Sequence, residues 1–263
     1  MNHKPKAALF AALLVLLSLA AAAAEVPVKS AWVAAPPAVD GVPADWGNPA
    51  FVDAAGGDVG YAFANDANNL YVLLVIRDPK AKSTIDKTGV TIYFSQAKKN
   101  KDYGILFHKV MIKPDEYIAR LEKQGPVSDE VRAQIKSKPG WYLYAHEVKG
   151  ATPEAAPASE TPVQNPVYKV GVQGPMTVYE FLIPLERPAS TQAGLDSAPG
   201  KTLFVGLEYG GMTPEMARAN ARATGSSNIA GGDNITQLVS STGTKVSAKK
   251  YAFWSQVALA AEK

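Results

Sequence analysis

The sequence contains no cysteine among its 263 residues. It therefore cannot form disulfides, a thiolate metal site, a cysteine nucleophile or a covalent haem attachment. Histidine is nearly as scarce: His3 lies at the N-terminus, and His108 and His146 are far apart in the sequence. A zinc site needs three or four ligands in tetrahedral reach, so two separated histidines do not indicate one.

The usual hydrolase motifs are also missing. The chain has neither a Gly-x-Ser-x-Gly elbow nor a His-Glu-x-x-His helix motif, the local patterns that place a nucleophile or a catalytic zinc. Any two of the 24 acidic residues could converge in the fold, but no pattern singles out a pair. The sequence therefore predicts a protein that is not an enzyme.

Residues 1–24 have the pattern of a secretory signal, with an early basic pair, a short apolar stretch and three alanines before Glu25. The apolar stretch is shorter than the roughly 20 residues that span a bilayer. Without this segment the net charge is +1, too small to steer the protein toward nucleic acid. We expect an exported protein, periplasmic or extracellular, with no membrane span after signal removal and no nucleic-acid partner.

Short alternating segments dominate the rest of the chain. Tyr179, Phe181 and Ile183 alternate with other residues, the period of a strand with one buried face. We expect strands at 59–64, 70–76, 90–95, 103–112, 141–148, 167–172, 177–185, 202–209, 235–239 and 251–259. This pattern predicts an all-β protein, an immunoglobulin- or jelly-roll-like β-sandwich that forms a single domain over residues 25–263.

A few short helices are expected in the connections. Pro114 begins one helix, Ser128 caps a second, and a third covers residues 213–225. The first two lie in an insertion at about 98–162, which ends in a Pro-, Ala- and Ser-rich loop. The Asp78-Pro79 pair is expected to end the second strand, because proline cannot continue a sheet ladder.

Four short motifs follow one another along the chain. They are Val39-Asp40-Gly41 with Asp45-Trp46; Asn65-Asp66 with Asn69-Leu70-Tyr71 and Asp78; Gly89-Val90-Thr91-Ile92-Tyr93-Phe94; and Glu180-Phe181-Leu182-Ile183-Pro184-Leu185. In this order they resemble the family 9 carbohydrate-binding modules and their DOMON-like relatives. The resemblance implies a β-sandwich that clamps a sugar between two tryptophans and often holds structural calcium. That clamp has no match here, since Trp46 and Trp254 occupy motif positions more typical of a core.

Aromatic and amide residues are the candidates for binding carbohydrate. A sugar site needs flat aromatic faces beside polar groups that fix hydroxyls. Trp141, Tyr142 and Tyr209 could supply the faces, and Asn228 a hydrogen bond. On a strand, Tyr142 and Tyr144 share a face while Trp141 points to the other side. Packing within the fold is the alternative role for each of these rings.

Two oxygen-rich turns are the candidates for calcium, which takes six to eight oxygen ligands. Asn65 and Asp66 lie in one turn, and Asp233 lies in the other. Hydrogen bonding within the turn is the alternative role for these side chains. Haem is less favoured; some DOMON-like relatives bind it non-covalently, and His108 and the methionines are the axial candidates here.

Together these observations favour an exported, non-catalytic module that binds saccharide or cell-envelope glycan. Two alternatives stay open from the sequence. One is a DOMON-like subunit that holds haem non-covalently or transfers electrons. The other is an envelope domain that binds another protein, whose identity the sequence does not indicate.

Overall fold

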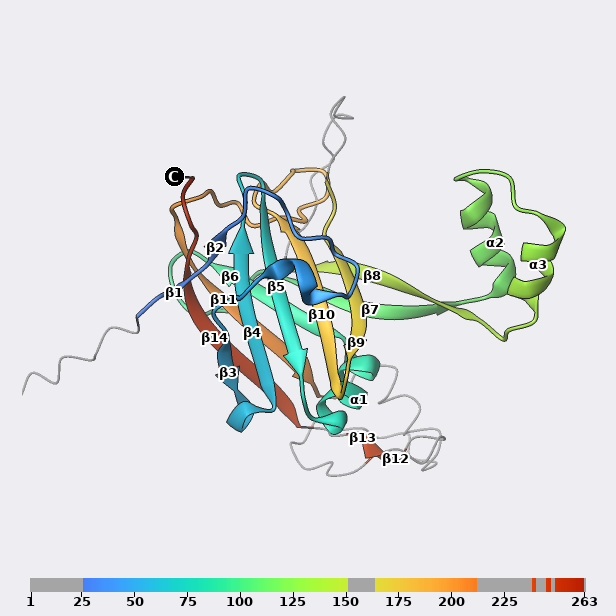
Figure 1. Cartoon of the computed structure of the whole chain (residues 1–263), viewed down its shortest axis with the longest axis horizontal. Helices are drawn as coiled ribbons and strands as arrows, with labels where there is room; N and C mark the ends of the chain where they lie inside the picture. The colour runs from blue at the N-terminus through green and yellow to red at the C-terminus, as the bar shows by residue number, and fades with distance from the viewer. Residues whose placement is uncertain (1–25, 151–163, 212–237, 240–244, 247–248, 263) are drawn as a thin grey trace, which may run out of the picture.

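Two six-stranded sheets face each other across a hydrophobic core in the computed structural model, which describes residues 26–150, 164–211, 238–239, 245–246 and 249–262 (Figure 1). The first sheet, sheet A, has the strand order β1-β14-β11-β6-β7-β8. The second, sheet B, has the order β2-β4-β5-β10-β9, and β3 pairs with β4. The all-β sandwich that the sequence predicts is confirmed.

The strand bounds follow the predicted segments closely. Sheet A contains β1 (Val28–Lys29), β6 (Val90–Ser95), β7 (Gly104–Ile112), β8 (Trp141–Lys149), β11 (Thr202–Gly210) and β14 (Lys250–Ala258). Sheet B contains β2 (Ala31–Trp32), β3 (Val52–Ala54), β4 (Val59–Asn65), β5 (Asn69–Ile76), β9 (Val167–Gln173) and β10 (Met176–Pro184). A separate pair joins β12 (Leu238–Val239) to β13 (Lys245–Val246). Of the predicted strand 235–239 only β12 is described, and the predicted helix 213–225 lies outside the described residues.

The alternation seen in the sequence sends one set of side chains into the core. Phe107 of sheet A packs edge-on against Phe181 of sheet B, with the ring centroids 4.9 Å apart. Phe181 and Ile183 on β10 are both fully buried, as are Ile92 and Ile105 on sheet A. Each fully buried side chain of this size contributes about 1.5–3 kcal/mol to the fold, which explains how it dispenses with disulfides.

A helix that the sequence analysis did not predict, α1 (Pro79–Thr88), follows β5. Asp78 does end the strand, but it also caps the helix, because its carboxylate accepts hydrogen bonds from the backbone N–H groups of Lys80 and Ala81. Pro79 occupies the first turn, where its missing N–H costs nothing. Gly89, at φ +72°, ends the helix, and a Cβ there would lie 2.5 Å from the carbonyl oxygen of Phe107.

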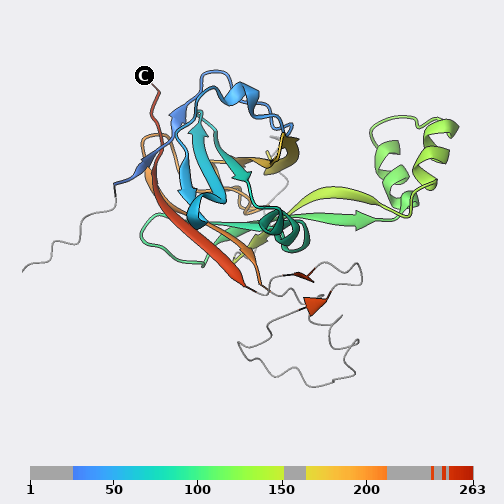
Figure 2. The ribbon, with the colours of Figure 1, turned by 60° about the horizontal axis from the view of Figure 1, so that its bottom comes forward.

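The described part of the predicted insertion, up to residue 150, forms an arm that leaves the sandwich, and the predicted Pro-, Ala- and Ser-rich loop lies outside the described residues. Strands β7 and β8 pair along their whole length, from Gly104–Lys149 to Ile112–Trp141. Only the first part of β7, up to Phe107, also pairs with β6. The tip of the arm carries α2 (Pro114–Glu122) and α3 (Asp129–Lys136), which lie well away from the sheets in two views (Figures 1 and 2).

The first and last of the four sequence motifs meet on the outer face of sheet B. The Glu180 carboxylate is fully buried and accepts hydrogen bonds from the backbone N–H groups of Asp40 (3.1 Å) and Gly41 (2.6 Å) and from Trp46 Nε1 (2.9 Å). Burial raises the pKa of this carboxyl despite the three donors. Gly41 adopts φ +91°, and a Cβ there would lie 2.8 Å from the Gly171 nitrogen. Trp46 is therefore half-buried on this outer face, not in the core as its motif position suggested.

Replacing Glu180 with glutamine tests this junction. Glu180→Gln keeps the shape of the side chain but puts an NH₂ group against one of the donors, so at least one buried donor loses its partner. We expect the free energy of unfolding to fall by about 2–3 kcal/mol, measured by urea denaturation. Glu186→Gln, at an exposed position just after the same strand, serves as the control and should change stability by less than about 0.5 kcal/mol. An equal effect of the two variants would contradict the role given to Glu180.

Candidate functional site

A row of tyrosines runs along the inner face of the arm toward the core. Strand register places Tyr142 and Tyr144 on the face of the hairpin that Phe107 occupies in the core. Tyr142 is 64% exposed and Tyr144 is 41% exposed. Tyr144 meets the buried ring of Tyr168 on β9 edge to face, with the centroids 5.0 Å apart. We call Tyr142, Tyr144 and Tyr168 the tyrosine strip.

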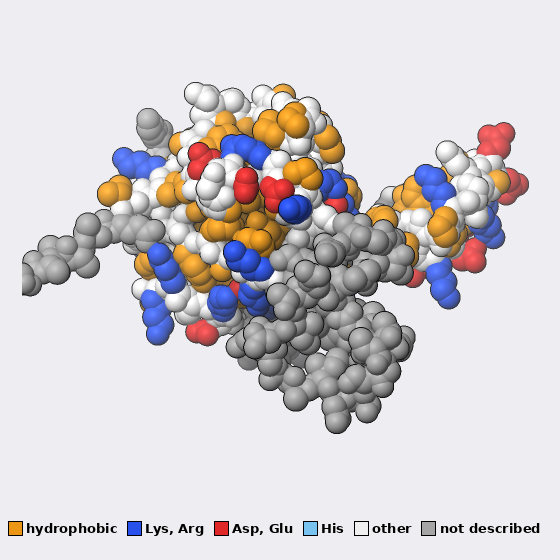
Figure 3. All heavy atoms as spheres, turned by 90° about the horizontal axis from the view of Figure 1, so that it is seen from below, with side chains coloured by type: hydrophobic (Ala, Val, Ile, Leu, Met, Phe, Trp, Pro, Cys, Tyr) orange, Lys and Arg blue, Asp and Glu red, His pale blue; other side chains and the backbone are white. Residues whose placement is uncertain are grey.

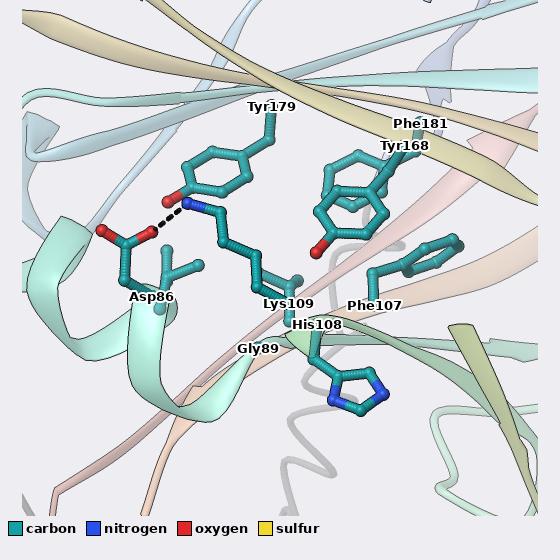
Figure 4. A pocket seen from close by; sticks show the side chains of 10 residues that line it. Asp86, Gly89, Phe107, His108, Lys109, Tyr168, Tyr179 and Phe181 are labelled. Carbon is teal, nitrogen blue, oxygen red and sulfur yellow. Dashed lines mark hydrogen bonds and ion pairs between the residues drawn. The ribbon is translucent and has the colours of Figure 1, made fainter. Parts of the chain in front are cut away.

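The inner end of the strip borders a small cavity between the two sheets, beside α1 (Figure 4). Its volume is about 10 Å³, room for one water molecule or one oxygen atom at most. Its lining combines aromatic rings with an ion pair and comes from α1, β6, β7, β9 and β10: Ile85, Asp86, Gly89, Val90, Phe107, His108, Lys109, Tyr168, Tyr179 and Phe181. We call the cavity together with the tyrosine strip the tyrosine cleft.

An ion pair stands at one side of the cavity. Lys109 Nζ lies 2.8 Å from Asp86 Oδ1, and Lys82, one helical turn before Asp86, binds the other carboxylate oxygen. Burial raises the pKa of the Asp86 carboxyl, but the hydrogen bonds from Lys109 and Lys82 outweigh it and leave the pKa below its ordinary value. The Asp86 and Lys109 side chains are only 27% and 23% exposed, so the pair is fixed at the wall of the cavity.

The Tyr179 hydroxyl is the unusual group in this site. Its ring is 2% exposed, and its oxygen is buried without any hydrogen-bond partner. In Figure 4 the hydroxyl points toward Asp86 and Lys109, across the cavity from Phe107. Burial, reinforced by the charge of Asp86, raises the pKa of Tyr179 far above its ordinary value, so the group stays a neutral O–H. A buried hydroxyl without a partner costs about 1–3 kcal/mol, so it can offer a hydrogen bond to a bound group.

The cleft does not fit a haem or a metal ion. A cavity of about 10 Å³ is far too small for a porphyrin, and His108 points away from it (Figure 4). Burial lowers the pKa of His146, the other histidine among the described residues, and so favours its neutral form. In the part of the chain that the structure describes, no three His, Cys, Asp or Glu side chains come close enough to hold a metal ion.

Trp141, a predicted platform residue, packs at the tip of the arm. Its ring is half-buried and stacks on Tyr117, with the centroids 4.9 Å apart and the planes 3° from parallel. Its indole N–H donates to the Ile135 carbonyl oxygen, and Lys138 Nζ lies 4.3 Å from the ring centre. Trp141 thus fastens α2 and α3 to the end of the hairpin, on the opposite face from Tyr142.

The other predicted carbohydrate residues lie elsewhere. Tyr209 is 3% exposed and stacks on Tyr251 inside the sandwich, at 5.0 Å between centroids, so it presents no face to a ligand. Asn228 lies outside the described residues. Of the predicted set, Tyr142 alone is an open aromatic surface among the residues whose positions the structure gives. Trp141, Tyr142 and Tyr209 therefore do not share one surface, and a binding role for Tyr142 stays a prediction.

The residues predicted to bind calcium are engaged in hydrogen bonds within the protein. Asn65 is fully buried; its Oδ1 accepts from Ser30 and from the Ala260 N–H, and its Nδ2 donates to the Ala260 carbonyl oxygen. Asp66 accepts from two backbone N–H groups of its turn and from the Tyr71 hydroxyl (2.7 Å). Asp233 lies outside the described residues. Turn chemistry accounts for the described oxygens, and calcium binding stays a prediction.

A second aromatic feature lies on the outer face of sheet A. Trp254 and Tyr93 lie nearly parallel, 6.2 Å apart. Strand register places four residues in one row across the sheet, in the order Trp254, Gly206, Tyr93 and Gly104. A Cβ at either glycine would lie 2.7 Å from the ring above it, so both rings rest directly on the backbone. Trp254 is therefore half-buried on an outer face, not in the core as its motif position suggested.

Seen from below, the described part of the sandwich shows hydrophobic side chains in the middle of the face and charged side chains about them (Figure 3). No helix among the described residues is long and apolar enough to cross a membrane.

Comparison with known proteins gives a likeness in structure only. No protein-family model matches the chain, and no curated protein matches it significantly. The similar solved structures include two of a family 9 carbohydrate-binding module from Caldicellulosiruptor kristjanssonii. In complex with cellotriose, that module is 12% identical, with 70% of this chain and 75% of that chain covered and a TM-score of 0.35. In complex with glucose, it is 12% identical, with 72% and 80% covered and a TM-score of 0.35. This is the family that the sequence motifs resemble.

Removing the unpartnered hydroxyl should make the protein more stable. Tyr179→Phe eliminates a buried donor that has no acceptor, so we expect the free energy of unfolding to rise by about 1 kcal/mol, seen as a higher melting temperature. Tyr61→Phe is the matched control, because the Tyr61 hydroxyl forms a hydrogen bond with Ser255 Oγ at 2.9 Å. In that variant the free energy of unfolding should fall by about 1 kcal/mol. Destabilisation of both variants to the same extent would show that Tyr179 has a partner after all.

The Asp86 ion pair should stabilise the fold in a pH-dependent manner. A carboxyl whose pKa is lower in the folded than in the unfolded protein adds stability above its unfolded pKa, near 3.9, and loses it as the pH falls through the folded pKa. We expect Asp86→Asn to lower the free energy of unfolding by about 1–2 kcal/mol at pH 7. This difference in stability between the variant and the wild type should disappear as the pH falls below about 4. Urea denaturation at a series of pH values measures it. The exposed Asp102→Asn should show neither effect, and a gap that stays constant with pH would contradict the assignment.

Proposed function

We propose that the protein binds saccharide in the tyrosine cleft, as an exported, non-catalytic module. The observation that carries this proposal is the continuity of the site. Exposed rings at Tyr142 and Tyr144 lead to a buried ring at Tyr168 and then to a small cavity with an ion pair and an unpartnered hydroxyl at its wall. Binding sites for small molecules combine such apolar surface with a few fixed polar groups.

The strip suits the apolar face of a sugar ring. Tyr142 and Tyr144 present aromatic surface on one side of a two-stranded arm, and the tyrosine side chain has few rotatable bonds to immobilise. Lys169 Nζ lies 5.1 Å from the centre of the Tyr144 ring, where it can reach a ligand hydroxyl. Stacking would thus give affinity, and the charged and hydroxyl groups would give orientation.

The cavity limits how far a ligand can enter. With room for one oxygen atom, it accepts a single substituent of a sugar while the ring itself remains on the strip. Such a substituent would meet the Tyr179 hydroxyl and the Lys109 ammonium. The site therefore favours a sugar that lies along the arm with one group directed inward.

Export is part of the proposal and is supported by the signal-like pattern of residues 1–24. A location in the periplasm or outside the cell would bring the cleft into contact with envelope or environmental glycans. Cleavage before Glu25, read by mass spectrometry of protein from the native cell, would establish it.

Alanine at either of the two exposed tyrosines should weaken saccharide binding without unfolding the protein. We expect Tyr142→Ala and Tyr144→Ala each to weaken binding about five- to tenfold, because each loses a stacking face. Binding would be measured by affinity electrophoresis and calorimetry against a panel of soluble oligosaccharides. Tyr142→Ala should leave the melting temperature nearly unchanged, since most of this side chain is in solvent.

Two aromatic controls locate the effect. Phe51→Ala removes a ring that is 43% exposed but lies before β3, and it should leave binding intact. Trp254→Ala removes the ring on the outer face of sheet A, and it too should bind normally. Unchanged binding by a Tyr142→Ala, Tyr144→Ala double variant, or loss of binding only in Trp254→Ala, would move the site away from the cleft.

A further inference from the structure

We infer that the tyrosine cleft selects an acidic saccharide, one whose carboxylate oxygen enters the cavity beside Lys109 and Tyr179. This inference rests on the proposed function and narrows it to a class of ligand. A uronic-acid residue of a glycan is the chemical class that combines a sugar ring for the strip with a carboxylate for the cavity.

The charge of the cleft favours an anion. Asp86 is the one acidic residue among the described residues that line the cavity. Lys109, which also lines the cavity, and Lys82 both bind it, and Lys169 stands over Tyr144 in the middle of the strip. Lys82 and Lys169 thus add two ammonium groups beside the Asp86–Lys109 pair. A positive surplus in a partly enclosed site raises the local concentration of anions and favours their binding.

The cavity offers unused hydrogen-bond donors to a group that enters it. Each oxygen of Asp86 already accepts a hydrogen bond from a lysine ammonium. Lys109 has three N–H donors, of which Asp86 takes one. Tyr179 holds a buried O–H with no partner. A group that accepts hydrogen bonds can use these donors, and hydrogen bonds to an ionised oxygen are about twice as strong as those to a neutral one.

The size of the cavity fits one oxygen of a carboxylate and no more. About 10 Å³ of space holds a water-sized group. The second carboxylate oxygen would stay at the mouth of the cavity. A sugar sulfate or phosphate shares the negative charge but has a third terminal oxygen to place at the same mouth.

A matched pair of ligands tests the inference. Oligomers of galacturonic, glucuronic and mannuronic acid would each be titrated against the wild-type protein beside the same oligomer after reduction of its carboxyl groups to neutral hydroxymethyl groups. We expect at least one acidic oligomer to bind about tenfold more tightly than its reduced form, the difference that one charge-assisted hydrogen bond supplies. The preference should shrink as salt is raised, because salt screens partly exposed charges.

Variants at the ion pair should move the preference in opposite directions. Lys109→Met should weaken binding of the acidic oligomer about tenfold and leave binding of the reduced form nearly unchanged. Asp86→Asn raises the positive charge of the cleft and should strengthen binding of the acidic form, whereas a merely structural role for the pair would weaken both forms in both variants. Lys201→Met, an exposed position before β11, is the charge-matched control and should change neither.

The outcomes separate this inference from the proposed function. Equal or tighter binding of the reduced oligomers, sensitive to Tyr142→Ala, would overturn the acidic selectivity and leave saccharide binding standing. Binding of neither form by the wild-type protein would overturn both. Equal losses for both forms in Lys109→Met would also overturn the selectivity, because the ammonium would then be acting on the fold.

Discussion

The buried carboxylate of Glu180 is the constraint on which the assembly of sheet B depends. It lies on β10, which pairs with β5 on one side and with the edge strand β9 on the other, and takes its three donors from a loop about 140 residues earlier in the chain. Because a buried charge without partners is very unfavourable, this loop must close over the sheet for β10 to be buried. The contact also explains why the Asp-Gly and Trp motif and the Glu-containing strand occur together in one sequence.

The cleft arises because one face of the β7–β8 hairpin continues beyond the core. Phe107 and His146 occupy this face inside the sandwich, and Lys109 pairs with Tyr144 at its border. Beyond them, Met111 and Tyr142 share the face with more than half of each side chain exposed. The pattern that fills a core thus leaves apolar surface in solvent once the opposing sheet ends.

The sequence predicts the strands well and the site only in part. The alternation of apolar residues correctly predicts β10. Tyr142 and Tyr144 lie on one face of β8, as two residues two positions apart on a strand must. The signals for α1 are also present, in Asp78, Pro79 and Gly89, but they read equally well as the end of a strand. Tyr168 and Tyr179 could not be assigned to a site, because their meeting with Tyr144 and Asp86 depends on strand order across two sheets. No local pattern encodes that order. Trp46 and Trp254 show a similar limit of prediction from sequence. A tryptophan that is half-buried on an outer face of the sandwich has the same sequence pattern around it as one in the core.

The arm has a mechanical consequence. Beyond Phe107, β7 pairs only with β8, so this ribbon is a cantilever that carries the helical tip at its free end. Sideways force on α2 or α3 acts with the leverage of the whole ribbon on the place where Tyr144 touches Tyr168. A force that displaced the tip would therefore widen or narrow the gap between those two rings.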